Sequence, residues 1–333
     1  MKYSNYIYTL ILSLVIGFFY NRYKRFEDIG EEKASYAMVQ KYLINMTPNG
    51  TTDNNNEDVA KKQFKKPILW IHMKYDVNAR WWNSFYSRNS TDLNQPYLYL
   101  TIKSIIDTCG QDFHICLIDD ESFGKLMPDW TVDVSLLADP VKTKVREIAL
   151  AKLLYRYGGL QVPPAFICFQ SLLPLYNYNM TRHSMFVAEL LNKTVSASDM
   201  LYMPNTAFLG CAKESPLMRE YVNFLEHVVS QDFVAESNIL GAAGQWCQAK
   251  VLKGEVGLVP ADALGQKDAE GAAVTLDRLV QNTYVNLSGN VLGLYIPADE
   301  LLNRLAYNWF ARLSAKQVLE SDTTIGKYLL ITR

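Results

Sequence analysis

This 333-residue chain lacks an excess of either charge, because its 33 lysines and arginines nearly balance its 34 aspartates and glutamates and leave a net charge of −1. Nucleic-acid binding depends on clustered cations that neutralise phosphates, so this balance argues against a nucleic-acid-binding class. Cysteine pairs at Cys-x-x-Cys spacing are also absent, which argues against a structural zinc site. The spacing favours isolated buried thiols. The five cysteines are Cys109, Cys116, Cys168, Cys211 and Cys247.

Long hydrophobic runs are scarce, and the one that stands out lies at residues 3–20. A bilayer span needs about 20 mostly apolar residues, with a lower limit near ~17. Aromatic residues flank this run where a membrane interface would lie. A cleaved signal peptide and a buried helix are the alternatives, but the basic stretch Asn21–Arg25 follows in place of a small-residue cleavage pattern. We therefore predict a retained single-pass anchor with its basic flank, residues 1–25, in contact with the lipid bilayer through residues 3–20.

Two signals disagree on the orientation of this anchor. Three basic residues follow the run and one precedes it, which by the positive-inside rule would place the body in the cytosol. Six N-glycosylation sequons indicate the opposite orientation. They begin at Asn45, Asn49, Asn89, Asn179, Asn192 and Asn286. We favour a lumenal body in the ER or Golgi.

The remaining chain divides by composition into a polar segment and a globular domain. Residues 26–64 are too polar to bury a core, so we expect a flexible stem there. Residues 65–333 alternate apolar runs of strand length with helical patterns. This alternation predicts an α/β domain with a mixed, mainly parallel sheet.

The pattern places the individual elements as follows. Strands are expected at 67–73, 113–118, 160–169 and 185–190, and helices at 97–108, 141–157, 217–229 and 235–251. Residues 254–277 have loop composition, and the aromatic tail 296–333 is expected to pack on the core. Pro163 and Pro164 fall inside the expected strand 160–169, which must bulge or lie open there because proline lacks the N–H donor.

Two aspartates follow the second expected strand. Ligands of parallel sheets bind at the carboxyl ends of strands, so Asp119 and Asp120 are candidates for metal or sugar contact. An aspartate at a helix start also satisfies free backbone N–H groups, and this cap is the interpretation that we favour for both.

Four short segments together resemble the glycosyltransferases whose sugar-binding region carries an Asp-x-Asp (DXD) motif, including the mannosyltransferase-like and capsular-polysaccharide types. They are His72 after the first strand, the acidic turn in 115–128, the Leu154–Gly159 stretch LYRYGG, and Asn205 with the proline-started helix behind it. The resemblance implies a GT-A-like nucleotide-sugar-binding fold, a nucleotide-sugar donor and a glycan or glycoprotein acceptor. The residues that it implies for substrate binding are His72, Asp119, Asp120, Glu147, Gly158, Gly159 and Asn205.

The motif itself is degenerate in this chain. Counted from the glycine pair, its three positions hold Pro163, Pro164 and Ala165. The family's upstream aspartate and arginine correspond to Glu147 and Leu150. Since Mg²⁺ and Mn²⁺ require carboxylate oxygens, the sequence does not support a divalent metal cofactor at this position.

The function therefore stays open at this point. A transferase could bind the donor diphosphate through Arg146, Lys152 or Arg156, although a solvated helix face is the more ordinary interpretation of these cations. Alternatively, the protein is an inactive binding or scaffold partner, or a carbohydrate-binding module. No residue of the sequence can be assigned a catalytic role.

Overall fold

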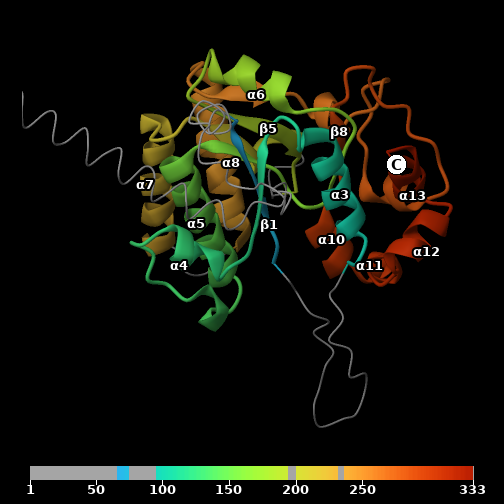
Figure 1. Cartoon of the computed structure of the whole chain (residues 1–333), viewed down its shortest axis with the longest axis horizontal. Coiled ribbons are helices and arrows are strands. Elements are labelled where there is room, and N and C mark those ends of the chain that lie inside the picture. Colours follow the sequence, from blue (N-terminus) through green and yellow to red (C-terminus); the bar gives the residue numbers. More distant parts are fainter. Residues whose placement is uncertain (1–65, 75–94, 194–199, 232–235, 333) are drawn as a thin grey trace, which may run out of the picture. The chain divides into compact units, whose positions relative to one another are not determined.

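The structure is a computed structural model that describes residues 66–74, 95–193, 200–231 and 236–332 (Figure 1). All of these belong to one unit, residues 44–333. The expected anchor at 1–25, the stem at 26–64 and the sequons at Asn45, Asn49 and Asn89 lie outside the described residues. Within the described ranges, no helix combines the length and apolarity that a bilayer crossing requires.

Strands and helices alternate through the first half of the domain. The strands are β1 (Ile68–His72), β2 (His114–Ile118), β3 (Gly159–Gln161), β4 (Phe166–Cys168), β5 (Met185–Leu191), β6 (Tyr202–Cys211), β7 (Gly257–Val259) and β8 (Gly293–Tyr295). The helices are α3 (Leu98–Cys109), α4 (Ser122–Leu126), α5 (Val141–Tyr157), α6 (Leu173–Met180), α7 (Pro216–Gln231), α8 (Glu236–Leu252), α9 (Leu276–Val280), α10 (Ala298–Asn303), α11 (Asn308–Ala311), α12 (Ala315–Glu320) and α13 (Thr324–Ile331). Single 3-10 turns are η1 (Val134–Leu136), η3 (Ala261–Leu264) and η4 (Leu305–Tyr307).

The main sheet has the strand order β2-β1-β3-β6-β5-β7. Strand β1 pairs in parallel with β2 and β3, and β5 pairs in parallel with β7. Strand β6 runs antiparallel to both of its neighbours, β3 and β5. The predicted α/β domain with a mixed, mainly parallel sheet is thus confirmed.

Strand β1 shows how the sheet separates two layers of helices. Its side chains alternate between the two faces of the sheet. Leu69 and Ile71 pack in the same buried cluster as Ile105 of α3. On the other face, the Trp70 ring lies 5.7 Å from that of Tyr157 in α5. Helices α3 and α5 therefore cover opposite faces of the sheet, as Figure 1 also shows.

Helix α5 ends at a glycine pair because no other residue fits the turn into β3. Gly158 and Gly159 have φ values of +69° and +106°, which L side chains rarely adopt. A Cβ on Gly159 would lie 2.3 Å from the carbonyl oxygen of Ile68 in the neighbouring strand. The Gly158 carbonyl accepts a hydrogen bond of 2.9 Å from the Trp70 indole. The two glycines thus allow α5 to pass directly into the centre of the sheet.

The prolines divert the chain out of the main sheet. The single strand predicted over 160–169 is wrong, because β3 ends at Gln161 and β4 pairs with β8 in a separate two-stranded sheet. The last main-sheet bond from this segment is donated by Val162 to the Trp70 carbonyl, at 3.0 Å. Pro163 and Pro164 have no N–H with which to continue the ladder.

The diverted segment joins a second core built by the C-terminal tail. Ala165 and Ile167 are buried there with Leu294, Phe310 and other residues of the tail. This confirms that the aromatic tail packs on the domain. Residues 254–277, predicted as loop, contain β7, η3 and the first residues of α9. These elements are too short to give a periodic sequence pattern.

The three described sequon asparagines differ in exposure. Asn179 and Asn192 are buried, and their side-chain amides donate to the carbonyls of Leu175 and Met200 at 2.9 Å each. Asn286 is exposed, with its amide 3.0 Å from Glu270. In the folded domain, Asn286 is therefore the described sequon that a glycan could occupy.

Candidate functional site

The strand order places a switch point between β1 and β3. The connection from β1 to β2 runs through α3, whereas the connection from β2 to β3 runs through α5 on the opposite face. Crevices at such points, outside the carboxyl ends of the strands, are where open α/β sheets bind ligands. The residues at this edge are the last strand residues His72 of β1 and Gln161 of β3, and those that follow β1, β2 and β3, namely Met73, Lys74, Asp119, Asp120, Val162 and Pro163.

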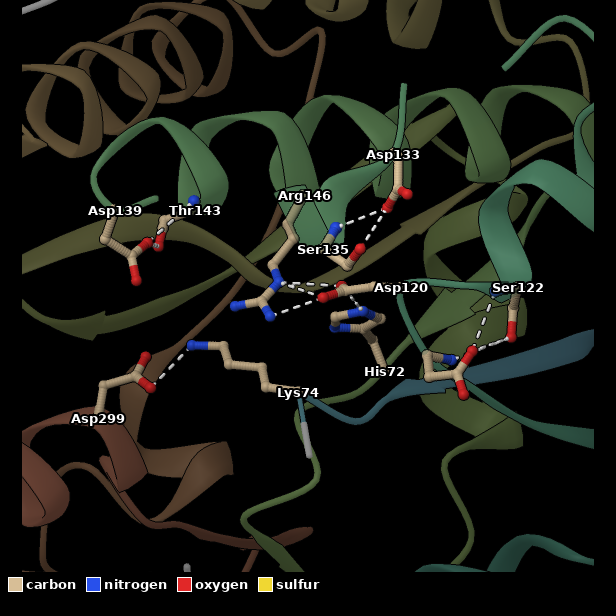
Figure 2. A network of polar contacts seen from close by, with 11 residues as sticks. His72, Lys74, Asp120, Ser122, Asp133, Ser135, Asp139, Thr143, Arg146 and Asp299 are labelled. Carbon is tan, nitrogen blue, oxygen red and sulfur yellow. Dashed lines mark hydrogen bonds and ion pairs between the residues drawn. The ribbon is translucent and has the colours of Figure 1, made fainter. Parts of the chain in front are cut away.

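An ion-pair cluster centred on Asp120 lies at this edge, on the α5 face of the sheet (Figure 2). Arg146 of α5 donates hydrogen bonds to both oxygens of this carboxylate, from Nε to Oδ1 at 2.9 Å and from Nη2 to Oδ2 at 2.7 Å. His72 places Nε2 3.1 Å from Oδ1. The His72 ring also stacks on Phe123 of α4, with centroids 5.2 Å apart. One carboxylate thereby connects β1, the β2 turn and α5.

The cluster holds Asp120 in its ionised form. Burial raises the pKa of this carboxyl, but the hydrogen bonds from His72 and Arg146 outweigh burial and lower it to about 2. The Asp120 and Arg146 side chains are only 18% and 9% exposed, so solvent screens this pair weakly. Both carboxylate oxygens already accept bonds from Arg146, so the cluster positions structural elements and leaves Asp120 poorly placed to bind a metal.

Asp119 serves a different purpose from its neighbour. Its Oδ1 accepts bonds from the backbone N–H and the hydroxyl of Ser122, at 3.0 and 2.6 Å. The predicted helix cap is thus confirmed for Asp119 at the start of α4. The predicted cap is wrong for Asp120, because both oxygens of its carboxylate accept hydrogen bonds from Arg146.

Glu147 belongs to a third network, between α5 and α7. Its Oε1 accepts hydrogen bonds from Tyr221 at 2.7 Å and from Thr206 at 3.0 Å. Burial raises the pKa of Glu147, and the two hydrogen bonds oppose this change. Burial also raises the pKa of Tyr221 well above its usual value. Glu147 therefore links β6 and α7 to α5.

The remaining candidates lie apart from these networks. Asn205 is exposed at the irregular step between β5 and β6, where its Oδ1 accepts the Ala207 N–H at 2.8 Å. Gly158 and Gly159 are buried at the centre of the sheet. Of the seven sequence-predicted site residues, the structure joins His72 directly to Asp120 and holds the others in separate contacts.

Two of the three residues at 163–165 make structural contacts. Ala165 is buried in the C-terminal core. The Pro164 carbonyl accepts a bond of 2.6 Å from the Thr101 hydroxyl of α3. Throughout the part of the chain that the structure describes, no three His, Cys, Asp or Glu side chains are grouped to hold a metal ion. Pro163, Pro164 and Ala165 have no side-chain oxygen with which to bind a divalent cation.

The three cations of α5 that the sequence offered for the donor diphosphate differ in exposure. Lys152 and Arg156 are partly exposed and lie near Glu226 and Asp129, as expected for a solvated face. Arg146 is buried, which corrects the interpretation of this residue as solvated and also commits it to Asp120.

Lys74 lies at the same strand edge and is not among the residues that the sequence predicted for substrate binding. It lies two residues beyond the end of β1, and its ammonium lies 2.8 Å from Asp299 of α10 (Figure 2). The two side chains are 36% and 74% exposed. Its position just after the first strand was the available signal, because such positions lie at the ligand edge of a parallel sheet.

Comparison with known proteins gives few matches. No protein-family model and no curated protein matches the chain. The chain is similar to the solved structure of the galactosyltransferase LgtC in complex with donor and acceptor sugar analogues, with 13% identity, 73% of this chain and 92% of that chain covered, and a TM-score of 0.35. It is also similar to the apo form of the glycosyltransferase GlyE from Streptococcus pneumoniae TIGR4, with 12% identity, 77% and 62% covered, and a TM-score of 0.37. Because these backbones overlap only in part, the functional argument below rests on the geometry of the site.

Proposed function

We propose that the domain is a glycosyltransferase-like protein that binds a nucleotide sugar at the carboxyl ends of β1 and β3, without a divalent metal at residues 163–165. The observation that carries this proposal is the switch point between these two strands, flanked by α3 and α5 on opposite faces. Two of the four segments that resemble glycosyltransferases meet at the same edge, since His72 of β1 contacts Asp120 after β2.

A nucleotide sugar brings a diphosphate whose negative charge must be balanced. Arg146 is already committed to Asp120, whereas Lys74 is paired with a largely exposed partner. Exposed ion pairs contribute little free energy, so the Lys74 ammonium can exchange Asp299 for a phosphate at small cost. Lys74 would then supply part of the charge that a metal ion supplies in DXD enzymes.

Calorimetric titration of the full chain in mild detergent tests this proposal. A panel of UDP-, GDP- and CMP-sugars would be titrated with Mn²⁺ and again with EDTA. We expect one donor class to bind with an affinity that EDTA leaves unchanged. Lys74→Ala should weaken that binding by about tenfold or more, as the loss of one charge-assisted hydrogen bond predicts. Lys316→Ala, which removes an 83% exposed ammonium from α12, is the matched control.

Two results would contradict the proposal. Failure of every donor to bind would remove the nucleotide-sugar site. Binding that requires Mn²⁺ would show that a metal site exists outside residues 163–165.

An inactive binding or scaffold protein is the second candidate. The packing of Pro164 and Ala165 favours it, because these contacts replace the metal ligands of a transferase with structural ones. Sugar transfer or donor hydrolysis in the same samples would support the transferase. Donor binding without turnover, on a panel of glycan acceptors, would support the binding protein.

The proposal also includes the membrane anchor at residues 3–20 and a lumenal body. Endoglycosidase treatment of protein from eukaryotic cells tests the orientation, and no change in electrophoretic mobility would count against it. Replacing Asn286 should remove any shift that arises from the described domain, because this sequon is exposed.

A further inference from the structure

Two cysteines that are far apart in sequence meet inside the domain. The Sγ atoms of Cys109, at the end of α3, and Cys168, at the end of β4, lie 3.8 Å apart. Both residues are fully buried. The expectation of isolated thiols is therefore wrong for this pair, because the diversion of the chain at the prolines brings β4 against α3.

Helix α3 holds the diverted segment at three successive points on one face. The Thr101 hydroxyl donates to the Pro164 carbonyl at 2.6 Å, and the Cys168 N–H donates to the Ser104 hydroxyl at 2.9 Å. Cys109 makes the third contact, through sulfur. These bonds fix the backbones on both sides of the thiol pair, so the two sulfurs are held in proximity by the fold itself.

We propose that Cys109 and Cys168 form a disulfide during oxidative folding, and that this bond ties β4, and with it the segment that replaces the metal-binding motif, to α3. A disulfide requires an S–S separation of about 2.0 Å. The remaining gap is of the size that a change of side-chain torsion covers. The bond would close a long loop, since the two cysteines are separated by 59 positions, and long loops gain most from such a link.

The reaction needs a disulfide oxidant, such as glutathione disulfide. The Cys109 thiolate attacks one sulfur of the oxidant, which releases one glutathione thiolate and leaves a mixed disulfide on Cys109. Cys168 then loses its proton and attacks the Cys109 sulfur, which releases the second glutathione thiolate. Two protein thiols are oxidised, one oxidant disulfide is reduced, and the two protons pass to solvent and glutathione.

In the folded, reduced protein, the environment of the pair favours the thiolate form of Cys109 over that of Cys168. The hydrogen bond from Cys168 lowers the pKa of Cys109 to about 7, although burial opposes this change. Because both thiols are buried in the finished fold, the exchange must occur while the chain folds. The oxidant must therefore be present in the compartment where the protein is made.

Refolding of the full chain in glutathione buffers of increasing oxidised fraction tests this proposal. Free thiols are then alkylated in denaturant, and the unreduced digest is analysed by mass spectrometry. We expect one cross-linked peptide pair that joins Cys109 to Cys168, with alkylated Cys116, Cys211 and Cys247. Recovery of all five cysteines in alkylated form, or a cross-link between another pair, would overturn the proposal.

A stability measurement provides a second test with a matched control. The melting temperature of the wild type should rise by several degrees in oxidising over reducing buffer. The Cys109→Ala/Cys168→Ala variant should lose this difference, whereas Cys116→Ala, which alters a buried thiol of β2, should keep it. A wild-type melting temperature that is equal or lower after oxidation would refute the stabilising link.

Discussion

The charge on Asp120 should contribute a large share of the stability of the domain at neutral pH. Its pKa falls from 3.8 to about 2 in the folded protein, and one pKa unit corresponds to about 1.36 kcal/mol, so the shift is worth about 2.5 kcal/mol. Asp120→Asn also leaves the Arg146 guanidinium, 9% exposed, without its counter-charge. Breaking a buried pair from one side costs about 3–5 kcal/mol. We expect this substitution to destabilise the domain by about 2.5–4 kcal/mol at pH 7.

The pH dependence gives the reasoning a second test. Because the folded pKa of Asp120 lies below the unfolded one, its contribution is complete above pH 3.8 and is lost as the pH falls through about 2. The gap in unfolding free energy between wild type and Asp120→Asn should therefore narrow on acidification.

Urea denaturation followed by tryptophan fluorescence measures this free energy. Glu320→Gln is the matched control, because it breaks an exposed pair with Lys316 and should cost no more than about 0.5 kcal/mol. A cost below about 1 kcal/mol for Asp120→Asn at pH 7 would contradict the assignment of Asp120 as the centre of the cluster. So would a cost that stays constant from pH 7 down to the acid transition.

Three further substitutions test other parts of the structure by the same urea assay. Gly159→Ala should lower the unfolding free energy by at least about 3 kcal/mol, since the new Cβ would lie 2.3 Å from the Ile68 oxygen at a φ of +106°. The control Gly254→Ala, with no atom within 4 Å of its Cβ, should cost about 1–2 kcal/mol for the backbone alone. Equal costs at the two glycines would argue against the close approach at Gly159. Burial raises the pKa of Glu147, so its contribution to the unfolding free energy is complete below pH 4.5 and is lost as the pH rises through the folded pKa. Glu147→Gln should therefore become more stable relative to wild type between pH 4 and pH 8. If the two unfolding free energies change with pH in parallel, a neutral Glu147 is contradicted. Thr101→Val removes the hydrogen bond to the Pro164 carbonyl and should cost about 1–2 kcal/mol of unfolding free energy. The control Thr181→Val, at an exposed position, should be nearly neutral. The same small cost at both sites would mean that the Pro164 contact does not stabilise the domain.

Much of the fold could be predicted because local patterns agree with it. The helix at 141–157 was predicted from its apolar spacing and its Gly-Gly stop, and α5 has these same bounds. The first two strands are short apolar runs buried in the sheet, and both were predicted to within a residue. Period-two and period-3.6 patterns survive into the structure wherever an element is long enough to show them.

The site was less accessible to sequence reasoning, because its contacts join residues far apart in the chain. His72 and Asp120 were selected by resemblance, yet nothing in the sequence indicated that Arg146 would bind the same carboxylate across 26 positions. Asp119 and Asp120 are adjacent and identical, so the sequence could not indicate that Asp119 caps a helix and Asp120 forms an ion pair. The side chains that the fold brings against each carboxylate separate the two, namely Ser122 for Asp119 and Arg146 for Asp120.

The sequence by itself determined that an α/β domain forms and that Pro163, Pro164 and Ala165 offer no carboxylate to a metal ion. The tertiary structure alone decided where this segment packs. The missing N–H groups of the prolines release the chain from the main sheet, and its apolar residues then pack with the C-terminal tail and α3. Proline chemistry is local and can be predicted from the sequence. The partner that the released segment finds depends on contacts with residues more than 50 positions away.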